Sequence, residues 1–454
     1  MSAHLGIGPT GSPVRLAELQ RQLAASPGDR AARHNLAVEL RKCGQSEAAL
    51  AEIERTWAEG LRLPETATMR GHLLADAGRF DEAIEAYREA VRVKPDLVEA
   101  HAALASLLPQ LGRGNEALDS LRDALGRAPQ TGLLWLEAMA LARGHQAWDQ
   151  LLAWAEAAEA RFGADTMVTA FAANALIGLE RDDEALARMD AALAIEPTYT
   201  PGHTIRAHIL LRKGDPAAAA AAAEQATRLS ARDQSAWALL RLAWRLLDDE
   251  REHWLCDYDN LVMPIEIGLD DDLPAVLEAR HRVAAHPADQ SLRGGTQTRG
   301  NLFEANDPVI HALAQVTRMA IEERLASLPR NPAHPFLSRN TGRISFPTSW
   351  SVRLASSGFH VSHIHPAGWM SSAYYASLPP EVAGGGGQGQ LAFGVPDAAL
   401  KIALPPRRLV QPREGLLVLF PSYLWHGTTP FESAAPRLTV AFDMLPVDNT
   451  GGQG

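Results

Sequence analysis

The sequence predicts a two-domain protein, in which an all-α solenoid of helical hairpins precedes an α+β domain built as a double-stranded β-helix, or jelly roll. Three observations predict this fold class. A 34-residue period runs through the first half of the chain, short alternating strands between glycine- and proline-rich turns fill the second half, and histidines followed by an arginine lie among those strands. We expect a tail and leading helix over residues 1–29, the solenoid with a capping helix over 30–250, and the jelly roll over 251–454.

The composition is that of an ordinary globular protein, with 46% hydrophobic and 21% charged residues. The net charge of -11 argues against a general binder of nucleic acid or of anionic membranes, since both need a basic surface. Cys43 and Cys256 are far apart, which excludes a disulfide framework and fits a reducing compartment. The sequence has neither a secretory signal pattern nor an apolar run of about 18 residues, so we expect a cytoplasmic protein without a membrane span.

Small or apolar residues recur every 34 residues at one phase of the first half. The members of this phase are Ala49, Ala83, Ala117, Leu151, Ala185 and Ala219. A second phase, five residues earlier, contains Gly44, Gly78, Gly112, Glu180 and Gly214, and a third contains Pro95, Pro129, Gly163 and Pro197. The pattern is typical of helical hairpins. Glycine ends the first helix and permits a tight turn, alanine lets the second helix approach closely, and proline stops the second helix.

The segment from Gly78 to Pro95 resembles the consensus of the tetratricopeptide repeat (TPR). The resemblance covers six copies over about residues 30–231, and the copy with Trp148 and Leu151 departs most from the consensus. A helix over Gln234–Leu247 is expected to cap the array and to meet the second domain. Because TPR arrays usually bind peptides or protein surfaces, the resemblance implies a protein or peptide partner. Dimerisation, giving a homo-oligomer, and bracing of the second domain stay open as alternatives.

Beyond about residue 250 the period stops and strand-like alternation begins. Two helices are expected, over Leu273–Ala285 and Pro308–Ser327. The predicted strands are Trp350–Ala355, Ser372–Leu378, Gln390–Val395, Leu416–Pro421 and Arg437–Met444. Short strands between such turns favour a barrel or a jelly roll. The glycine run 384–387 is expected to be a loop, either slack in a hairpin or a lid over a site.

Three histidines and an arginine form the candidate site of this domain. His363 and His365 are two residues apart, so on an extended strand both side chains lie on the same face. His426 follows a later apolar strand. In the last predicted strand Arg437 and Thr439 share a face, and a buried arginine needs an anionic partner. Together these residues can hold one metal ion and one dicarboxylate.

These residues resemble the motifs of the Fe(II)/2-oxoglutarate-dependent dioxygenases. In that superfamily a double-stranded β-helix presents His-x-Asp/Glu, then a distal His, and then an Arg-x-Ser/Thr pair shortly beyond it. The resemblance implies that His363 and His426 are catalytic metal ligands, and that Arg437 and Thr439 bind the far carboxylate of 2-oxoglutarate. The cofactors that it implies are Fe(II), 2-oxoglutarate and O2.

His365 stands where most of the superfamily has Asp or Glu, because the usual facial triad is two histidines and one carboxylate. A closer resemblance, over about residues 285–445, is to a subfamily with His-x-His-Pro, a serine-rich Tyr-Tyr motif and His-Gly-Thr. Here these motifs are His363–Pro366, Ser371–Tyr375 and His426–Thr428. The resemblance implies His365 as the third metal and catalytic ligand. His360 is the reserve candidate if a bulge turns it to the same face.

Further residues are expected around the pocket. Tyr375 is a candidate donor to the cosubstrate, although a core aromatic fits its position as well. A polar, glycine-rich segment over residues 290–298 is interpreted as a substrate-side loop, with a structural turn as the alternative. The candidate substrate-side residues are Arg293, Gln297, Arg353 and Trp425.

The resemblance therefore implies an oxygenase that hydroxylates an unknown substrate, with a protein or peptide recruited by the TPR groove as one candidate. Two alternatives remain open. A three-histidine metal dioxygenase that uses no 2-oxoglutarate would leave the pair of Arg437 and Thr439 without a role. A TPR interaction protein with a catalytically inactive jelly roll is the other.

Overall fold

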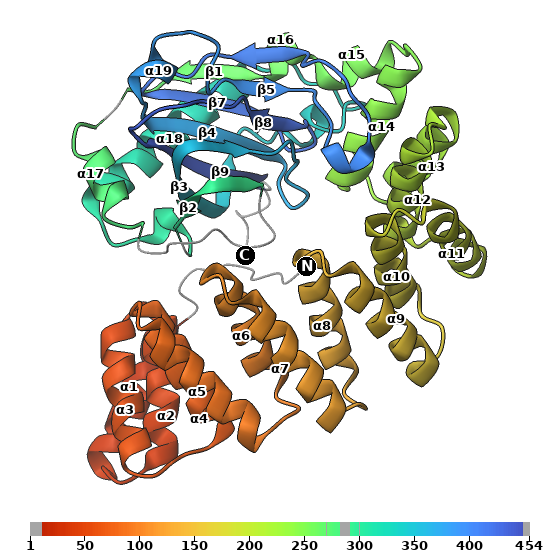
Figure 1. The fold of residues 1–454 in the computed structure, drawn as a ribbon. Coiled ribbons are helices and arrows are strands. Elements are labelled where there is room, and N and C mark those ends of the chain that lie inside the picture. Colours follow the sequence, from red (N-terminus) through yellow and green to blue (C-terminus); the bar gives the residue numbers. More distant parts are fainter. Residues whose placement is uncertain (1–10, 269, 282–290, 299, 448–454) are drawn as a thin grey trace. The chain divides into compact units, whose positions relative to one another are not determined.

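The computed structural model describes residues 11–268, 270–281, 291–298 and 300–447. The chain divides into two compact units, Met1–Arg161 and Phe162–Gly454 (Figure 1). The second unit contains both the last helices of the solenoid and the whole β-rich domain. The last repeats therefore pack as one body with the strands. No helix in the described residues is long and apolar enough to cross a membrane.

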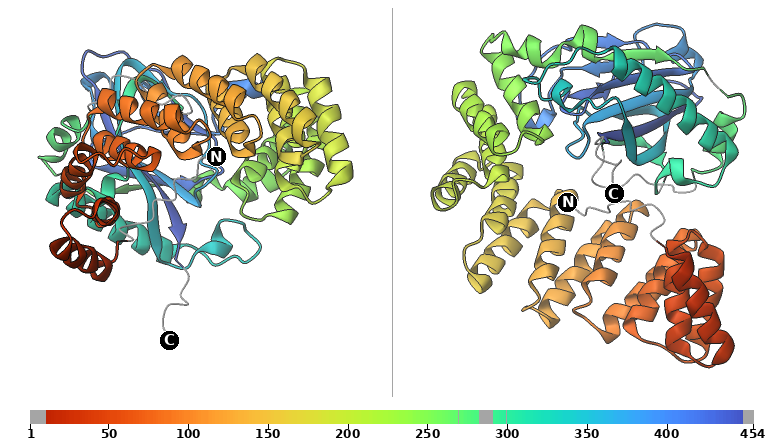
Figure 2. Two further views of the ribbon diagram at one scale, coloured as in Figure 1. Left: turned by 90° about the horizontal axis from the view of Figure 1, so that it is seen from below. Right: turned by 180° about the vertical axis from the view of Figure 1, so that it is seen from behind.

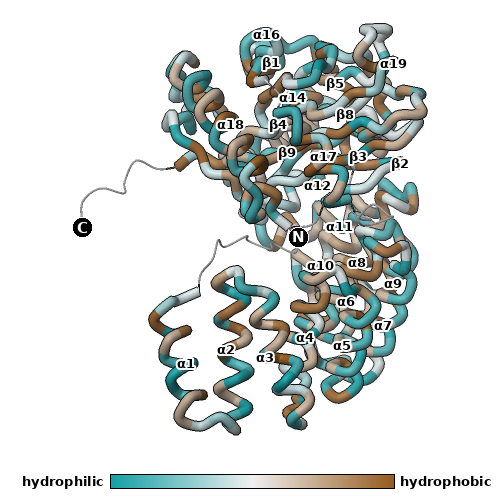
Figure 3. Tube along the Cα trace, turned by 90° about the vertical axis from the view of Figure 1, so that its left-hand side faces the viewer, coloured by the Kyte–Doolittle hydropathy of each residue, from teal (hydrophilic) through white to brown (hydrophobic). Residues whose placement is uncertain are grey.

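The first part of the chain is a solenoid of helical hairpins, as the repeat predicts, preceded by one helix and followed by another. The helices are α1 (Pro13–Ala25), α2 (Arg30–Lys42), α3 (Ser46–Ala58), α4 (Pro64–Asp76), α5 (Phe80–Val93), α6 (Val98–Gln110), α7 (Gly114–Arg127), α8 (Gly132–Gly144), α9 (Trp148–Phe162), α10 (Thr166–Gly178), α11 (Asp182–Ile195), α12 (Thr200–Arg212), α13 (Pro216–Leu229) and α14 (Gln234–Leu246). Hydrophobic and hydrophilic residues are interspersed along most of these helices (Figure 3).

The small-residue phase of the repeat marks the contact between the two helices of each hairpin. All six of its members are between 0% and 1% exposed. The turn between the two helices needs one residue in the left-handed region, which favours glycine. The positions that adopt it are Gly44, Gly78, Gly112, Gln146, Glu180 and Gly214. Two repeats thus keep the turn geometry although they lack the glycine.

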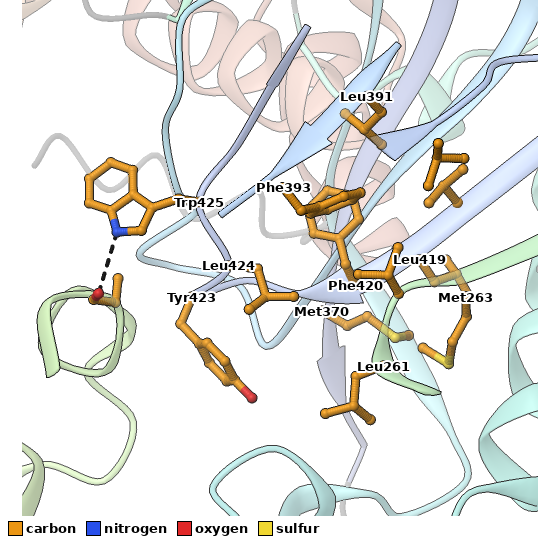
Figure 4. Packing of buried hydrophobic residues seen from close by; sticks show 14 of the residues in the cluster. Leu261, Met263, Met370, Leu391, Phe393, Leu419, Phe420, Tyr423, Leu424 and Trp425 are labelled. Carbon is orange, nitrogen blue, oxygen red and sulfur yellow. Dashed lines mark hydrogen bonds between the residues drawn. The ribbon is translucent and has the colours of Figure 1, made fainter. Parts of the chain in front are cut away.

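Helix α14 joins the solenoid to the β-rich domain. The Arg245 guanidinium donates to the backbone oxygen of Gly394 at 2.8 Å. The Trp425 indole donates to the backbone oxygen of Ala238 at 3.3 Å (Figure 4). A continuous hydrophobic core runs from these helices into the strands. The prediction that this helix meets the second domain is confirmed by these contacts.

The β-rich domain contains two antiparallel sheets. The larger has the strand order β1-β7-β4-β9-β3-β2 and the smaller the order β6-β5-β8 (Figure 1). The strands are β1 (Met263–Glu266), β2 (Leu292–Gln297), β3 (Ile344–His360), β4 (Met370–Ser377), β5 (Leu391–Phe393), β6 (Arg408–Val410), β7 (Leu416–Pro421), β8 (His426–Thr428) and β9 (Arg437–Pro446). All five predicted strands are present, and the antiparallel architecture agrees with a jelly roll.

Short helices and one long helix surround the sheets. They are α15 (Arg251–Cys256), α16 (Tyr258–Leu261), α17 (Leu273–Glu278), α18 (Pro308–Ser327) and α19 (Pro380–Ala383), with 3-10 turns at Leu302–Glu304, Leu337–Arg339 and Ala398–Leu400. Helix α18 has the predicted bounds and lies across the face of the larger sheet, as seen from behind in Figure 2. The helix predicted over Leu273–Ala285 is shorter, since α17 ends at Glu278, and residues 282–285 lie outside the described residues.

The predicted substrate-side loop over residues 290–298 is instead strand β2 over most of its length; Gln290 lies outside the described residues. Glycine lowers strand propensity, which is why the pattern favours a loop. In this strand the glycines allow the close pairing of β2 with β3. A Cβ atom on Gly295 would lie 2.3 Å from the backbone oxygen of Arg353, so only glycine permits this approach of β2 to β3. Gly294 has φ +69 at the register shift next to it.

Candidate metal centre

The candidate ligands His363 and His365 do not lie on a regular strand, in contrast to the prediction. Strand β3 ends at His360, and both residues follow in an irregular connection. The cause is their backbone pairing. His363 exchanges two backbone hydrogen bonds with His426, at 2.9 and 3.0 Å, and the N–H of His365 donates to the backbone oxygen of Ser422 at 3.0 Å. The segment from Ser422 to His426, which leads from β7 into β8, therefore positions His363 and His365 next to His426.

The three imidazoles converge on one point. The Nε2 atoms of His363 and His365 are 3.2 Å apart. The rings of His363 and His426 have centroids 4.2 Å apart. One ligand atom from each of the three residues lies within 4.8 Å of the other two. Such a group of nitrogen donors has the size of a metal site.

Each of these imidazoles has its other nitrogen held by a hydrogen-bond acceptor. His363 Nδ1 is 2.9 Å from the backbone oxygen of Val361, and His426 Nδ1 is 2.9 Å from that of Leu424. His365 Nδ1 is 2.7 Å from the Asp443 carboxylate. Because carbonyl and carboxylate oxygens only accept, Nδ1 carries the proton in each ring and Nε2 keeps a free lone pair. This arrangement is usual for histidines that bind metals.

The protein interior keeps His363 and His426 neutral. Burial, and after it the neighbouring His365, lowers the pKa of His363 to about 3. Burial also holds the pKa of His426 well below its usual value. Phe420 packs against the His426 ring with centroids 4.4 Å apart and contributes to this dry environment. Neutral imidazole is the form that binds a metal ion.

These residues fit a divalent metal ion. Two lone pairs that face each other at 3.2 Å repel unless a cation lies between them. Two nitrogens about 2.1 Å from a common ion, at a right angle, would be about 3 Å apart. Three imidazoles suit iron, zinc, copper or nickel, so the donor set alone does not identify the ion.

Arg437 lies at the start of β9 and is 3% exposed. Its Nη1 donates to the backbone oxygen of Gly389 at 2.9 Å, and its guanidinium lies 5.0 Å from the centroid of the Tyr375 ring. In the part of the chain that the structure describes, no carboxylate pairs with it, its Nε has no hydrogen-bond partner, and the buried Tyr375 hydroxyl has no partner besides this guanidinium. Thr439 lies opposite Tyr375 in the pairing of β4 with β9. These buried donors fit a carboxylate from a ligand.

Residues 348–443 match the model of a family described as "Putative 2OG-Fe(II) oxygenase". This segment is therefore similar to that family. Residues 71–112 match a family described as "TPR repeat", in agreement with the helical hairpins. Both resemblances that the sequence motifs indicate are thereby confirmed. None of the curated proteins matches the chain.

Solved structures similar to this chain are TPR proteins and their complexes. A tetratricopeptide repeat protein from Parabacteroides merdae has 16% identity and a TM-score of 0.34, with 50% of this chain and 90% of that one covered. The Cut9–Hcn1 hetero-tetramer of APC/C has 18% identity and a TM-score of 0.33, with 51% and 46% covered. YrrB, a TPR protein with an unusual peptide-binding site, has 16% identity and a TM-score of 0.29, with 48% and 95% covered.

The β-rich domain needs a glycine directly after His426. A Cβ atom on Gly427 would lie 2.9 Å from the backbone oxygen of His360 and 3.2 Å from the backbone of Ser362. Any side chain would therefore push apart the two backbone segments that the His363–His426 pairing joins. Close packing of the backbone therefore explains why glycine follows histidine in the His-Gly-Thr motif.

The reserve candidate His360 lies beside the three histidines of the β-rich domain. The Ser291 hydroxyl is 2.9 Å from His360 Nδ1 and 3.2 Å from His363 Nε2. Ser357, with φ 62, distorts β3 shortly before it. His360 is therefore close to the site, but it is outside the group whose ligand atoms lie within 4.8 Å of one another.

The substrate-side candidates separate into two pairs. Arg353 is not brought to the site. It lies on the opposite face of β3 from Val352, which pairs with Thr439, and its guanidinium contacts the Glu278 carboxylate at 2.6 Å. Strand alternation therefore turns Arg353 outward. Trp425 is not brought there either, because its indole points to α14 (Figure 4).

The other pair, Arg293 and Gln297, lies nearer the site. Gln297 pairs with Val352, which pairs with Thr439, so these three residues form one row across β2, β3 and β9 on the same face as Arg437. Arg293 lies in β2 next to Leu292, the residue that pairs with His360.

Two polar side chains beside the histidines were not named as site residues from the sequence, although Ser291 lies in the segment 290–298 that was interpreted as a substrate-side loop. Ser291 precedes β2, and Asp443 lies near the end of β9. Asp443 has the same strand phase as Arg437 and Thr439, since the three are separated by even numbers of residues. That alternation is the signal in the sequence by which Asp443 could have been found.

Proposed function

We propose that the β-rich domain is an Fe(II)/2-oxoglutarate-dependent oxygenase that hydroxylates a C–H bond of its substrate. His363, His365 and His426 would hold the iron, and Arg437 would hold the cosubstrate. One observation carries the proposal. Three histidines whose Nδ1 atoms are held by acceptors, and whose ligand atoms lie within 4.8 Å of one another, lie in the same domain as a buried guanidinium that has no carboxylate partner in the described residues. A metal ion explains the first feature and a dicarboxylate explains the second.

When bound, iron and 2-oxoglutarate supply the oxidising chemistry, in which O2 converts 2-oxoglutarate to succinate and CO2 and one oxygen atom enters the substrate. The chain itself supplies position and charge. The Arg437 fork can meet a carboxylate with two parallel hydrogen bonds, and the Tyr375 hydroxyl can donate a third. Thr439 lies on the same face of β9. Phe420 keeps water from one side of the histidines.

We also propose that the TPR repeats recruit a protein or peptide as the substrate or as a partner. The helical hairpins and the TPR family match support a role in protein interaction. A metal dioxygenase without 2-oxoglutarate is disfavoured, because it would leave Arg437 buried without an anion.

Succinate release tests the proposed function. The purified protein, supplied with Fe(II), 2-oxoglutarate and air, should release succinate above the level of a His363→Ala variant, and more when a substrate captured by the TPR repeats is present. That substrate should gain the mass of one oxygen atom. Release no greater than that of the variant would contradict the proposal.

A further inference from the structure

Asp443 is a buried carboxylate beside one of the candidate ligands. It is 9% exposed, and its Oδ1 is 2.7 Å from His365 Nδ1. The Ser371 hydroxyl donates to the same oxygen at 2.7 Å and is itself 2.8 Å from the Ser422 hydroxyl. Ser371 and Asp443 are directly opposite each other in the pairing of β4 with β9. The sheet register and the serine together fix the orientation of the carboxylate.

The packing around this carboxylate is close. A Cβ atom on Gly368 would lie 2.4 Å from the Ser422 hydroxyl and 3.4 Å from the Asp443 carboxyl carbon. On the other side of the pair, the Trp350 ring stacks on that of His365 at 5.9 Å between centroids. The surroundings thus hold both the acid and the imidazole in one arrangement, which precise metal binding requires.

His365 differs from the other two histidines in the partner of its Nδ1. His363 and His426 donate to neutral backbone carbonyls, whereas His365 donates to a carboxylate. His365 is also the residue that stands where a His-x-Asp/Glu motif has its carboxylate. A divalent ion with two histidines and one carboxylate carries a net charge of about +1. Three neutral histidines alone would leave +2, and the Asp443 carboxylate returns the sum to +1.

We infer that Asp443 is a positioning residue that supplies the negative charge of this metal centre through His365. The carboxylate holds the Nδ1–H tautomer, points Nε2 at the ion and makes the imidazole a stronger donor. The inference rests on the proposed function in so far as His365 is a metal ligand. It adds that the negative charge of the usual triad comes from a side chain on β9 that contacts the ligand His365 and does not contact the ion itself.

Metal affinity of the full chain without cosubstrate tests the inference. The probe is Co(II), titrated into the metal-free protein and followed by its visible absorption. Asp443→Asn keeps the shape of the side chain and removes its charge, and we expect it to weaken Co(II) binding about 10- to 100-fold. The control is Asp307→Asn, which removes a carboxylate at the start of α18, away from the histidines, and should leave the affinity unchanged. An Asp443→Asn affinity within about threefold of that of the unchanged protein would overturn the inference.

A double-mutant cycle separates this role from a merely structural one. If Asp443 acts through His365, Asp443→Asn should cost almost nothing in a His365→Ala background, so the two effects are not additive. Additive effects would assign Asp443 a structural role and overturn the inference. Failure of the proposed function is distinguishable, since in that case the unchanged protein would bind Co(II) without forming a complex with 2-oxoglutarate.

Discussion

Replacement of Arg437 by methionine should separate cosubstrate binding from iron binding. The guanidinium is 3% exposed, and it is stabilised by one carbonyl at 2.9 Å and by the Tyr375 ring at 5.0 Å. Methionine has a similar length and no charge. Arg437→Met therefore removes the partner of the cosubstrate carboxylate and leaves the three histidines in place.

The expected loss of 2-oxoglutarate affinity can be estimated from the burial of Arg437. Loss of one partner of a buried, hydrogen-bonded charge pair costs about 2–5 kcal/mol. At about 1.4 kcal/mol for each factor of ten, the Kd for 2-oxoglutarate should rise about 30-fold to a few thousand-fold. The ligand-free protein should unfold at nearly the same temperature. The variant loses the ring contact and the hydrogen bond to Gly389, but it no longer buries a charge without a counterion.

Isothermal titration under anaerobic conditions measures both affinities. Fe(II) should bind the Arg437→Met variant within about threefold of the unchanged protein, because no ligand atom is altered. Arg353→Met is the matched control, since this arginine is on the opposite face of the adjacent strand and pairs with Glu278. Equal losses of Fe(II) and 2-oxoglutarate affinity, or a large drop in the unfolding temperature, would refute the role of Arg437.

Three other predictions concern the backbone and the acid stability. Gly427→Ala should reduce Co(II) affinity at least tenfold, because its Cβ would lie 2.9 Å from a backbone oxygen; unchanged binding would contradict this account of the motif. Gln146→Gly should stabilise the first unit by about 1 kcal/mol in urea unfolding, since Gln146 has φ 55, and Gly112→Ala should destabilise it. Burial lowers the pKa of His281 from 6.5 to about 4, so the folded state binds fewer protons and the free energy of unfolding falls as the pH drops through this range. His281→Gln should remove part of that fall, as urea unfolding at pH 7 and pH 4.5 would measure.

The solenoid was predictable because its determinants are local. Each hairpin repeats the same turn and a small or apolar contact residue, and the period identifies both even where Glu180 replaces glycine. The strand β2 was not predictable in this way. Its glycines reflect a close approach to β3, which depends on a partner some 60 residues away in the sequence.

The three candidate histidines come together as the sequence predicts, but for a partly different reason. His363 and His365 converge because their backbones pair with the segment around His426, and a strand geometry is not needed. The contact of Asp443 with His365 depends on the register between β4 and β9, which a single sequence does not reveal. The same holds for Trp425, whose partner is on α14.

The most direct test of the account is an anaerobic titration of the Fe(II)-loaded protein with 2-oxoglutarate, followed by visible absorption. Chelation of the iron by the keto acid produces a metal-to-ligand charge-transfer band. We predict a saturable band in the unchanged protein, a much higher midpoint in Arg437→Met, and no band in His426→Ala. A folded, unchanged protein that binds Fe(II) and gives no band would contradict the central claim that these histidines and this arginine form one 2-oxoglutarate-dependent centre.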